Sequence, residues 1–241
     1  MTNAKLLVTF TRLLRRSWLE GADAASIKLH LSLYRQWADS VARQASPLTE
    51  EVPWFTYSAI DFLQRTLMPG MMVFEYGSGG STMFWAKAGA SVVSIEHDEE
   101  WSKAVVAAAA TRGFDKVDLK LILPVDVGAS PGDPADPARY SSSRDEYKTF
   151  SFEAYAKAID AYPDNSFDIV LVDGRARPSC FVHAQSKVKP GGWLILDDAQ
   201  RESYQRVQRE IDSTWARKAF PGLAPSKDQW GTTAMWQKAA G

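Results

Sequence analysis

The stretch "VFEYGSGGSTMFWAK" at residues 73–87 decides the fold of this 241-residue chain. A short apolar run ends in Glu75, a turn with Gly77, Gly79 and Gly80 follows, and helical character begins at Ser81. Glycines carry no side chain, so the main chain of such a turn can approach a ligand closely. The stretch therefore predicts a strand, a ligand-binding turn and a helix, in that order.

Apolar runs and helical segments alternate after this stretch, which predicts a mostly parallel sheet covered on both faces by helices. Runs such as "FDIVLVD" and "WLILDD" are apolar without alternation, as strands buried on both sides should be. The expected fold class is α/β and Rossmann-like. Strands are expected at 71–75, 91–95, 117–123, 167–172, 192–196 and 231–237, and helices at 81–88, 99–112, 151–161, 178–187 and 201–219.

Residues 1–68, before the stretch, have helical patterns and are expected to form an N-terminal helical extension or cap. Helices are expected over 4–19, over 23–44 and from Pro53 to Pro69. The first has a broad apolar face and four basic residues before its first acid, Glu20. Two interpretations stay open: it packs on the domain or on a second copy of the chain, or it lies on a membrane surface.

The composition limits the partners and the compartment. A formal net charge of −1 gives no field that favours nucleic acid, so no nucleic-acid partner is expected. The single cysteine, Cys180, excludes an internal disulfide and is typical of a reducing compartment. The expected location is therefore cytoplasmic, with peripheral membrane contact through the first helix as the alternative.

Three residues in and near the glycine turn limit which class of ligand it can bind. Glu96 ends the next expected strand, 19 residues after Gly77, where a carboxylate can accept hydrogen bonds from ribose hydroxyls. The dinucleotide pattern requires Gly or Ala where this chain has Thr82, and Glu75 suits a cationic ligand better than a pyrophosphate. No Gly-Lys-Ser/Thr follows the turn, so it is not a phosphate loop.

The turn resembles motif I of the class I S-adenosylmethionine-dependent methyltransferases, which consists of an acid, any residue and then Gly-x-Gly. The resemblance covers about residues 70–240 and includes Glu96, "FDIVLVDG" and "VKPGGWLILDD". It implies a methyltransferase domain over 69–241 with a mostly parallel seven-stranded sheet. The Pro-, Gly- and Ser-rich segment 124–150 is then an inserted loop.

The resemblance also implies the cofactor, S-adenosyl-L-methionine, and the residues that hold it. In the family, motif I holds the methionine end and the acid of the second strand holds the ribose, which here implies Glu75, Gly77, Gly79, Gly80, Ser81 and Glu96. His97 can pack on the adenine and Asp126 can accept from its amino group. Core packing or solvation explains these last two residues equally well.

Three aspartates follow neighbouring expected strands. Asp173 ends the strand at 167–172, and Asp197 and Asp198 end the strand at 192–196, so all three should meet at one edge of the sheet. Carboxylates so close together must be protonated or neutralised, and Mg²⁺ or another divalent cation would do this. The arrangement resembles the catechol and sugar O-methyltransferases, in which aspartates at these positions bind Mg²⁺, and implies a metal site at Asp173, Asp197 and Asp198.

The general base stays open. Catechol-type enzymes carry a lysine three residues after the first aspartate, where this chain has Ala176. The candidates are Asp173, His183 and metal-assisted loss of the proton. Arg175 and Arg177 either bind a carboxylate or phosphate of the substrate or pair with the aspartates in place of a metal.

The function expected from these features is S-adenosylmethionine-dependent O-methylation of a hydroxyl on a sugar, a glycan or another small molecule. Two alternatives stay open. One is a methyltransferase acting on a protein or RNA, and the other is a non-catalytic S-adenosylmethionine-binding or oligomerisation module. A homo-oligomer is compatible with each of them.

Overall fold

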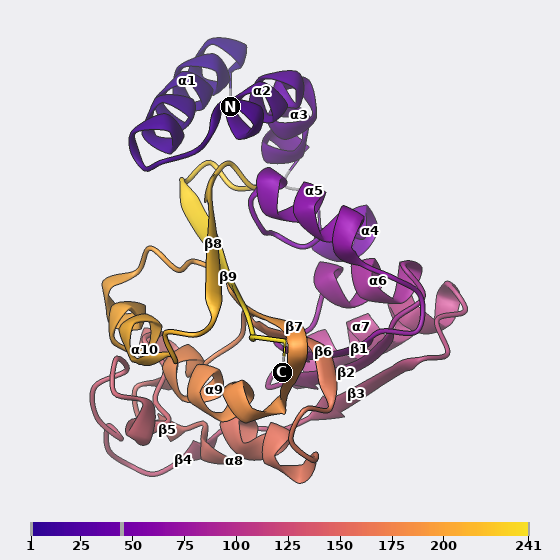
Figure 1. Ribbon diagram of the computed structural model, residues 1–241, viewed down its shortest axis with the longest axis vertical. Coiled ribbons are helices and arrows are strands. Elements are labelled where there is room, and N and C mark those ends of the chain that lie inside the picture. The colour runs from indigo at the N-terminus through magenta and orange to yellow at the C-terminus, as the bar shows by residue number, and fades with distance from the viewer. Residues whose placement is uncertain (1, 44–45, 241) are drawn as a thin grey trace.

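A seven-stranded sheet with helices on both faces forms the body of the protein (Figure 1). The computed structural model describes residues 2–43 and 46–240. It confirms the predicted α/β, Rossmann-like class. The strands of the sheet, in spatial order, are β3 (Val117–Leu121), β2 (Ser91–Glu96), β1 (Met72–Tyr76), β6 (Phe167–Val172), β7 (Val188–Leu196), β9 (Gly231–Gln237) and β8 (Ala216–Gly222).

The strand directions set this sheet apart from the dinucleotide-binding fold. Five strands pair in parallel, while β9 runs antiparallel to both of its neighbours, β7 and β8. The dinucleotide-binding order has six parallel strands and no inserted antiparallel strand. The direction of winding reverses between β1 and β6, so the turns after these two strands meet at the switch point where open α/β sheets bind their ligands.

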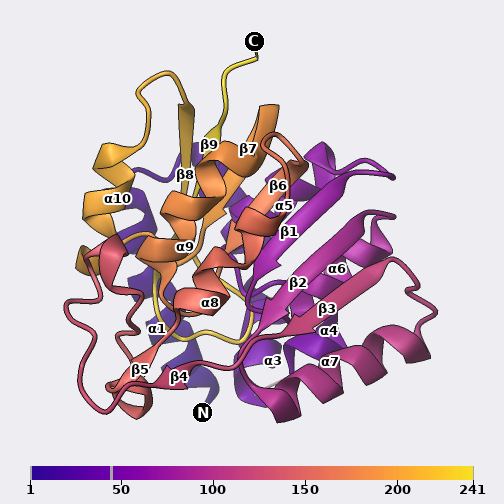
Figure 2. The same cartoon turned by 90° about the horizontal axis from the view of Figure 1, so that it is seen from below.

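Two apolar layers cover the sheet because successive strand side chains point to opposite faces. Phe74, Val170 and Leu194 belong to one layer, and Val73, Ile169 and Ile195 belong to the other. In Figure 2, α8 and α9 lie in front of the strands and α5 and α6 behind them. The helices of this domain are α6 (Gly80–Lys87), α7 (Glu99–Thr111), α8 (Glu153–Ala156), α9 (Arg177–Ala184) and α10 (Gln205–Glu210).

The N-terminal extension is helical as predicted, with corrected boundaries. The helix predicted over 23–44 is divided at Leu33, and its predicted last residue, 44, lies outside the described residues. The helix predicted from Pro53 begins at Tyr57, because Thr56 is extended and bonds Phe220 and Thr233 of the β8–β9 hairpin. The elements are α1 (Asn3–Leu19), α2 (Ala24–Ser32), α3 (Tyr34–Arg43), α4 (Pro47–Glu50) and α5 (Tyr57–Thr66).

The long helix predicted over 201–219 is wrong. A 3₁₀ turn (Glu202–Tyr204) and the short α10 end at Glu210, and β8 then pairs with β9 along its whole length. Pro221 is incompatible with a helix interior but is tolerated in β8, which forms the edge of the sheet. Strand β8 completes the seven-stranded sheet. Its first four residues lie within the range that was predicted as a helix.

The segment predicted as a loop at 124–150 is closed at its two ends by a small antiparallel ladder. Strand β4 (Val125–Asp126) pairs with β5 (Phe150–Ser151). Between them lie two 3₁₀ turns, η1 (Pro137–Arg139) and η2 (Asp145–Tyr147), and η1 packs against α9. The insert is therefore held beside the turn that precedes α9, next to the switch point.

Candidate active site

The turns after β1 and β6 touch one another at the switch point. Gly77 has a φ of +90°, which L side chains rarely adopt, and a Cβ there would lie 2.9 Å from the Cα of Gly174. The contact leaves no room for a side chain at either glycine, since a Cβ at Gly174 would clash with the Tyr155 hydroxyl. Glycine at 77 is therefore needed for both its backbone conformation and its close approach.

A cavity of about 600 Å³ opens above these two turns, and we call it the glycine-turn cavity. Its walls come from the turns after β1, β2 and β6, from the segment before α5 and from the insert. Of the predicted site residues, Gly77, Gly79, Gly80, Ser81, Glu96, His97, Asp173 and Arg175 line it. The other lining residues are Ser46, Pro47, Pro53, Trp54, Ser78, Asp98, Trp101, Glu146, Tyr147 and Gly174.

The predicted contact between Glu75 and the methionine end of the cofactor needs correction. Glu75 is fully buried beneath the turn and does not line the cavity. Its carboxylate accepts hydrogen bonds from side chains of β2 and α6, and the Thr82 hydroxyl among these donors accepts in turn from the Gly79 amide at 2.9 Å. Glu75 therefore positions the glycine turn from below. Its other donors are the Ser81 hydroxyl at 2.7 Å, the Ser94 hydroxyl at 2.8 Å and the Trp85 indole at 3.1 Å.

Gly80 also has a packing role. A Cβ on this residue would lie 2.2 Å from the Val52 carbonyl oxygen and 2.7 Å from that of Pro47. The absent side chain lets the segment 46–54, which links α3 to α5, lie directly on the start of α6. The N-terminal extension thereby supplies one wall of the glycine-turn cavity.

Glu96 presents a permanently charged carboxylate to the cavity. Burial alone would raise the pKa of Glu96, but hydrogen bonds from His97, Ser78 and Asp98 and the proximity of the His97 ring lower it to about 2. One oxygen accepts from the amides of His97 and Asp98, and the other accepts from the amide and hydroxyl of Ser78. These four donors fix the orientation of the carboxylate at the wall of the cavity.

Aromatic rings flank this carboxylate. The Trp101 indole donates to the Ser78 carbonyl at 2.9 Å, and the His97 ring packs edge-on against Tyr147 with 5.4 Å between ring centroids. All three aromatic residues line the cavity and offer surfaces for a flat heterocycle. The predicted adenine partner Asp126 is elsewhere: it is exposed on β4, where it accepts from the Gly128 amide. The pairing of β4 with β5 carries it away from the cavity.

The three predicted aspartates do meet at the edge of the sheet, together with three cationic side chains. Arg177 pairs with Asp173 at 2.9 Å and with Asp198 at 3.4 Å. Lys227, from the loop between β8 and β9, pairs with Asp197 at 3.3 Å. Asp198 also pairs with Lys227, at 3.9 Å, and with Arg201.

These pairings do not fit the predicted metal site. Three cations already neutralise the three carboxylates, and the Asp197 side chain also accepts from the Thr233 hydroxyl at 2.7 Å. Within residues 2–43 and 46–240, no group of three His, Cys, Asp or Glu side chains is arranged to hold a metal ion. The alternative that an arginine takes the place of the metal fits the contacts, with Arg177 rather than Arg175 in that position.

Asp173 differs from Asp198 in its titration. Burial raises the pKa of Asp173 to about 7, against the lowering effect of Arg177, and the nearby Asp197 adds to the rise. In contrast, Arg177, Lys227 and Arg201 outweigh burial at Asp198 and lower its pKa. Asp173 also lines the glycine-turn cavity. It is therefore a carboxylate at the ligand site whose pKa is raised above its ordinary value.

The structure places His183, a predicted catalytic residue, outside the glycine-turn cavity. Its Nδ1 lies 2.8 Å from Asp160 and its Nε2 lies 3.3 Å from the Tyr140 hydroxyl. It lies six residues after Arg177 along α9, which puts the two side chains about 120° apart around the helix, so His183 lies on a different face from the one that meets the aspartates.

A second cavity, of about 340 Å³, lies on the far side of the aspartates, and we call it the aspartate cavity. Trp54 lines both cavities and joins them. Lys227 and Trp230 line the second one but are missing from the predicted site, because the loop that carries them was not expected beside the sheet edge. Its remaining lining residues are Thr56, Asp197, Asp198, Gln200, Arg201, Ala224, Ser226, Asp228, Gln229 and Gly231.

Comparisons with known proteins find relatives by structure alone. No protein-family model matches the sequence. A search of curated proteins finds no significant match.

Several solved structures share the fold. An O-methyltransferase from Bacillus cereus in complex with SAH is 16% identical, covering 83% of this chain and 89% of its own, with a TM-score of 0.57. A putative rRNA methylase from Clostridium thermocellum is 11% identical over 76% and 96%, with a TM-score of 0.53. A putative methyltransferase from Streptococcus mutans in complex with SAH is 12% identical over 75% and 96%, with a TM-score of 0.52. The chain therefore has the fold of the class I S-adenosylmethionine-dependent methyltransferases.

Proposed function

We propose that the protein transfers a methyl group from S-adenosylmethionine to a hydroxyl group of a small molecule, sugar or glycan, and that Asp173 accepts the hydroxyl proton. The position of Asp173 is the observation that carries this proposal. It lines the cavity formed by the glycine turn and has a pKa of about 7. A carboxylate with this pKa can take a proton at neutral pH, as a general base must.

The glycine-turn cavity fits S-adenosylmethionine in size and chemistry. Its volume of about 600 Å³ lies in the range of small-molecule sites. The charged Glu96 would accept from the ribose hydroxyls, and Trp101, His97 and Tyr147 would pack around the adenine. The main chain at Gly77 and Gly79 would lie along the methionine end. When bound there, the cofactor supplies an electrophilic methyl group on a positively charged sulfur.

The residues around Asp173 suit the removal of a proton from an acceptor. Arg177 holds one oxygen of Asp173 at 2.9 Å and so fixes the orientation of the carboxylate. An acceptor hydroxyl next to the free oxygen would give up its proton as its own oxygen attacks the methyl group. Lys227 pairs with Asp197, and Arg201 pairs with Asp198. Because these cations balance the neighbouring carboxylates, the proposed proton transfer to Asp173 does not require a metal ion.

The neighbouring aspartate cavity supports a polar small molecule as the acceptor. Its lining combines charged and amide side chains with the rings of Trp54 and Trp230, a mixture that suits a polyol or sugar with one apolar face. The net charge of −1 gives no support for RNA as the acceptor. A cofactor-binding module without catalysis would differ in one respect, since replacing Asp173 would leave its function unchanged.

A methylation screen with isotopically labelled S-adenosylmethionine tests the proposal. Sugars, polyols and glycans are offered as acceptors, with RNA and a protein extract as separate arms, and products are read by their mass shift. We expect label in a hydroxyl compound, at the same rate with excess EDTA as with added Mg²⁺. Activity that disappears in EDTA and returns with Mg²⁺ would contradict the metal-free proton transfer, and label only in RNA or protein would contradict the acceptor.

We also propose that α1 contacts an anionic membrane surface. Leu6, Phe10 and Leu13 pack inward on the rest of the protein, while Val8, 71% exposed, and Leu19, 69% exposed, face solvent together with Leu7 and Trp18. Arg12, Arg15 and Arg16 lie on the same side as this apolar strip. None of the helices described in the structure is long and apolar enough to cross a bilayer, so the contact would be peripheral.

Sedimentation with lipid vesicles checks this contact. We expect binding to phosphatidylglycerol vesicles at low salt and little binding to phosphatidylcholine, because the strip is both apolar and basic. Val8→Glu should reduce the bound fraction several-fold, whereas Leu31→Glu, at an exposed leucine on α2, should not. Equal binding of the two variants, or none by the unmodified protein, would count against the membrane. A concentration-dependent dimer lost in Val8→Glu would assign the strip to a second copy.

A further inference from the structure

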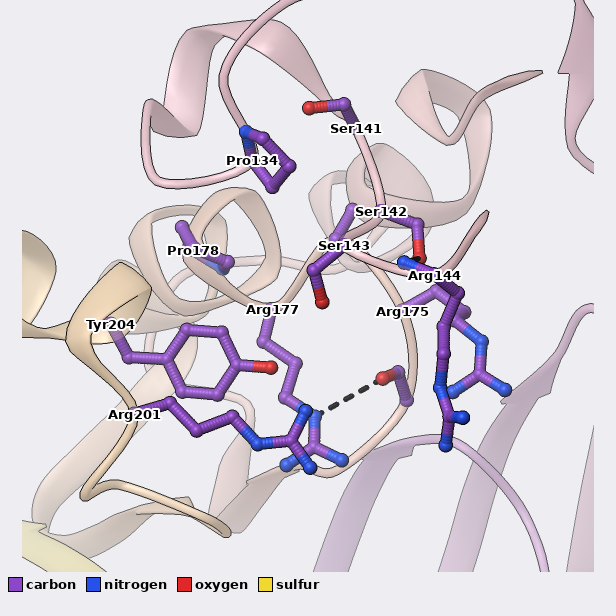
Figure 3. Close-up of a pocket in the computed structure, with 12 residues that line it drawn as sticks. Pro134, Ser141, Ser142, Ser143, Arg144, Arg175, Arg177, Pro178, Arg201 and Tyr204 are labelled. Atoms are coloured by element: carbon purple, nitrogen blue, oxygen red, sulfur yellow. Dashed lines mark hydrogen bonds between the residues drawn. The ribbon is translucent and has the colours of Figure 1, made fainter. Parts of the chain in front are cut away.

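A third cavity lies beside the aspartates, between the insert and the start of α9, and we call it the arginine cavity (Figure 3). Its volume is about 30 Å³. The walls come from the insert, from the turn after β6 with the first residues of α9, and from the turn before α10. Its lining residues are Pro134, Ser141, Ser142, Ser143, Arg144, Gly174, Arg175, Ala176, Arg177, Pro178, Arg201 and Tyr204.

The charge of this cavity is unbalanced. Four of the lining residues are arginines and none is acidic. Arg177 and Arg201 pair with aspartates outside the lining, as described above. Arg144 and Arg175 make no ion pair with any carboxylate in the described part of the chain. The exposed Arg144 and the half-buried Arg175 therefore line one cavity without a paired carboxylate, an arrangement that suits an oxyanion.

One buried hydrogen-bond donor of the cavity lining also lacks a partner. The Arg175 Nε is buried and makes no hydrogen bond in the structure. The Arg175 guanidinium lies 5.7 Å from the centre of the Tyr147 ring, which orients it between the insert and the turn after β6. Figure 3 shows the side chains of Arg144 and Ser143 from the insert, and those of Arg175 and Arg177 from the turn after β6 and the start of α9, around this cavity. Donors from the insert and from the turn after β6 thus line the same cavity.

The size of the cavity limits what it can bind. A volume of about 30 Å³ holds roughly two water-sized groups, so it has no room for a sugar ring. A carboxylate or the outer oxygens of a phosphate ester fit this space. The remainder of such a molecule would extend out of the cavity. Gly174 and Arg175 line both this cavity and the glycine-turn cavity, so the molecule would pass close to Asp173.

We propose that the methyl acceptor carries an oxyanion, as a phosphate ester or a carboxylate, and that Arg144 and Arg175 bind this group and thereby place a nearby hydroxyl at Asp173. The inference rests on the proposed function and narrows its acceptor to anionic hydroxyl compounds. Bidentate hydrogen bonds from the guanidinium groups would fix the orientation of the acceptor. The insert, through Ser141–Arg144, then acts as the specificity element of the enzyme.

Anion binding is tested in a protein already saturated with S-adenosylhomocysteine, whose binding is measured first. Inorganic phosphate, sulfate and acetate are titrated by calorimetry at low ionic strength. We expect one phosphate site per chain, weakened about tenfold to a hundredfold in Arg175→Gln and in Arg144→Gln, because each change removes a charge-assisted hydrogen bond. Arg209→Gln is the matched control, since Arg209 is an exposed arginine on α10 that does not line the cavity.

A second set of assays compares sugar phosphates, uronic acids and their uncharged sugars as methyl acceptors. We expect methylation of one anionic class, with KM raised in Arg144→Gln and Arg175→Gln, and the preferred class separates phosphate from carboxylate. The proposal is overturned if uncharged sugars react equally well, if RNA alone is methylated, or if Arg209→Gln weakens phosphate as much as the other variants. Failure to bind S-adenosylhomocysteine in the first step would instead overturn the proposed function.

Discussion

Replacing Gly77 with alanine is expected to weaken the binding of S-adenosylhomocysteine by about a hundredfold or more. An alanine at a φ of +90° costs about 1–2 kcal/mol, and overpacking typically costs a further 1–3 kcal/mol. The added Cβ would lie 2.9 Å from the Gly174 Cα, so the turns after β1 and β6 must move apart. The two costs together come to about 2–5 kcal/mol. The free protein relieves this strain by moving the turns apart, and binding must restore them, so a cost of about 3 kcal/mol weakens the affinity by about a hundredfold at about 1.4 kcal/mol for each tenfold change.

Gly191→Ala is the matched control for this variant. Gly191 has a φ of +78°, but a Cβ there would meet no atom within 4 Å. It therefore isolates the cost of the backbone conformation from the cost of the clash, at a position outside the glycine-turn cavity. Calorimetric titration of both variants, with circular dichroism to confirm folding, decides the matter. Unchanged affinity in a folded Gly77→Ala protein would show that the ligand does not lie against this turn.

Asp173→Asn is expected to lower kcat for methyl transfer by about a hundredfold to ten-thousandfold, the usual contribution of a general base. Asparagine keeps the size of the side chain and removes its ability to take a proton. The binding of S-adenosylhomocysteine should change little, because Gly77, Gly79 and Glu96 are untouched. Asp160→Asn, which removes the partner of His183 on the other side of α9, should leave kcat nearly unchanged.

The pH dependence of the rate gives an independent check of the same residue. The pKa of Asp173 is about 7, and only its deprotonated form acts as a base, so kcat should rise with pH below about 7 and level off above it. In Asp173→Asn this rise should be absent. A variant that keeps the rate and the pH profile of the unmodified enzyme would remove Asp173 from the mechanism.

The parts of the site that follow from strand ends could be predicted from the sequence. Asp173, Asp197 and Asp198 each end a parallel strand, and strands of this kind bring their carboxyl ends to one edge, where the structure has all three. Glu96 follows the same rule at the end of β2. The sequence pattern was sufficient for these residues because any residue at the carboxyl end of a parallel strand lies at the ligand-binding edge of the sheet.

The orientation of Glu75 could have been predicted from the strand period and was missed. Successive side chains of β1 alternate between faces, and Glu75 shares the face of Val73, which α6 covers. The donors Thr82 and Trp85 lie on that helix, so the carboxylate is satisfied there rather than at the ligand. Glu75 therefore holds the glycine turn in position but does not line the cavity in which the cofactor would bind.

The charge partners of the aspartates could not be predicted from local pattern. Lys227 is 30 residues from Asp197 along the chain and reaches it through the β8–β9 hairpin. Because a helix was predicted over 201–219, the β8–β9 hairpin was not expected. Without Lys227 near the aspartates, a metal ion was the simplest source of positive charge for the three carboxylates. Arg144 was missed for a similar reason, since only the packing of η1 on α9 brings the insert to the site.

The glycine turn after β1 is expected to bind S-adenosylmethionine and not a dinucleotide. Calorimetric titration of the unmodified protein with S-adenosylhomocysteine and, separately, with NAD tests it most directly. We predict a single S-adenosylhomocysteine site per chain with an affinity in the micromolar range, and no heat of binding with NAD. Saturable binding of NAD, with none of S-adenosylhomocysteine, would contradict the account.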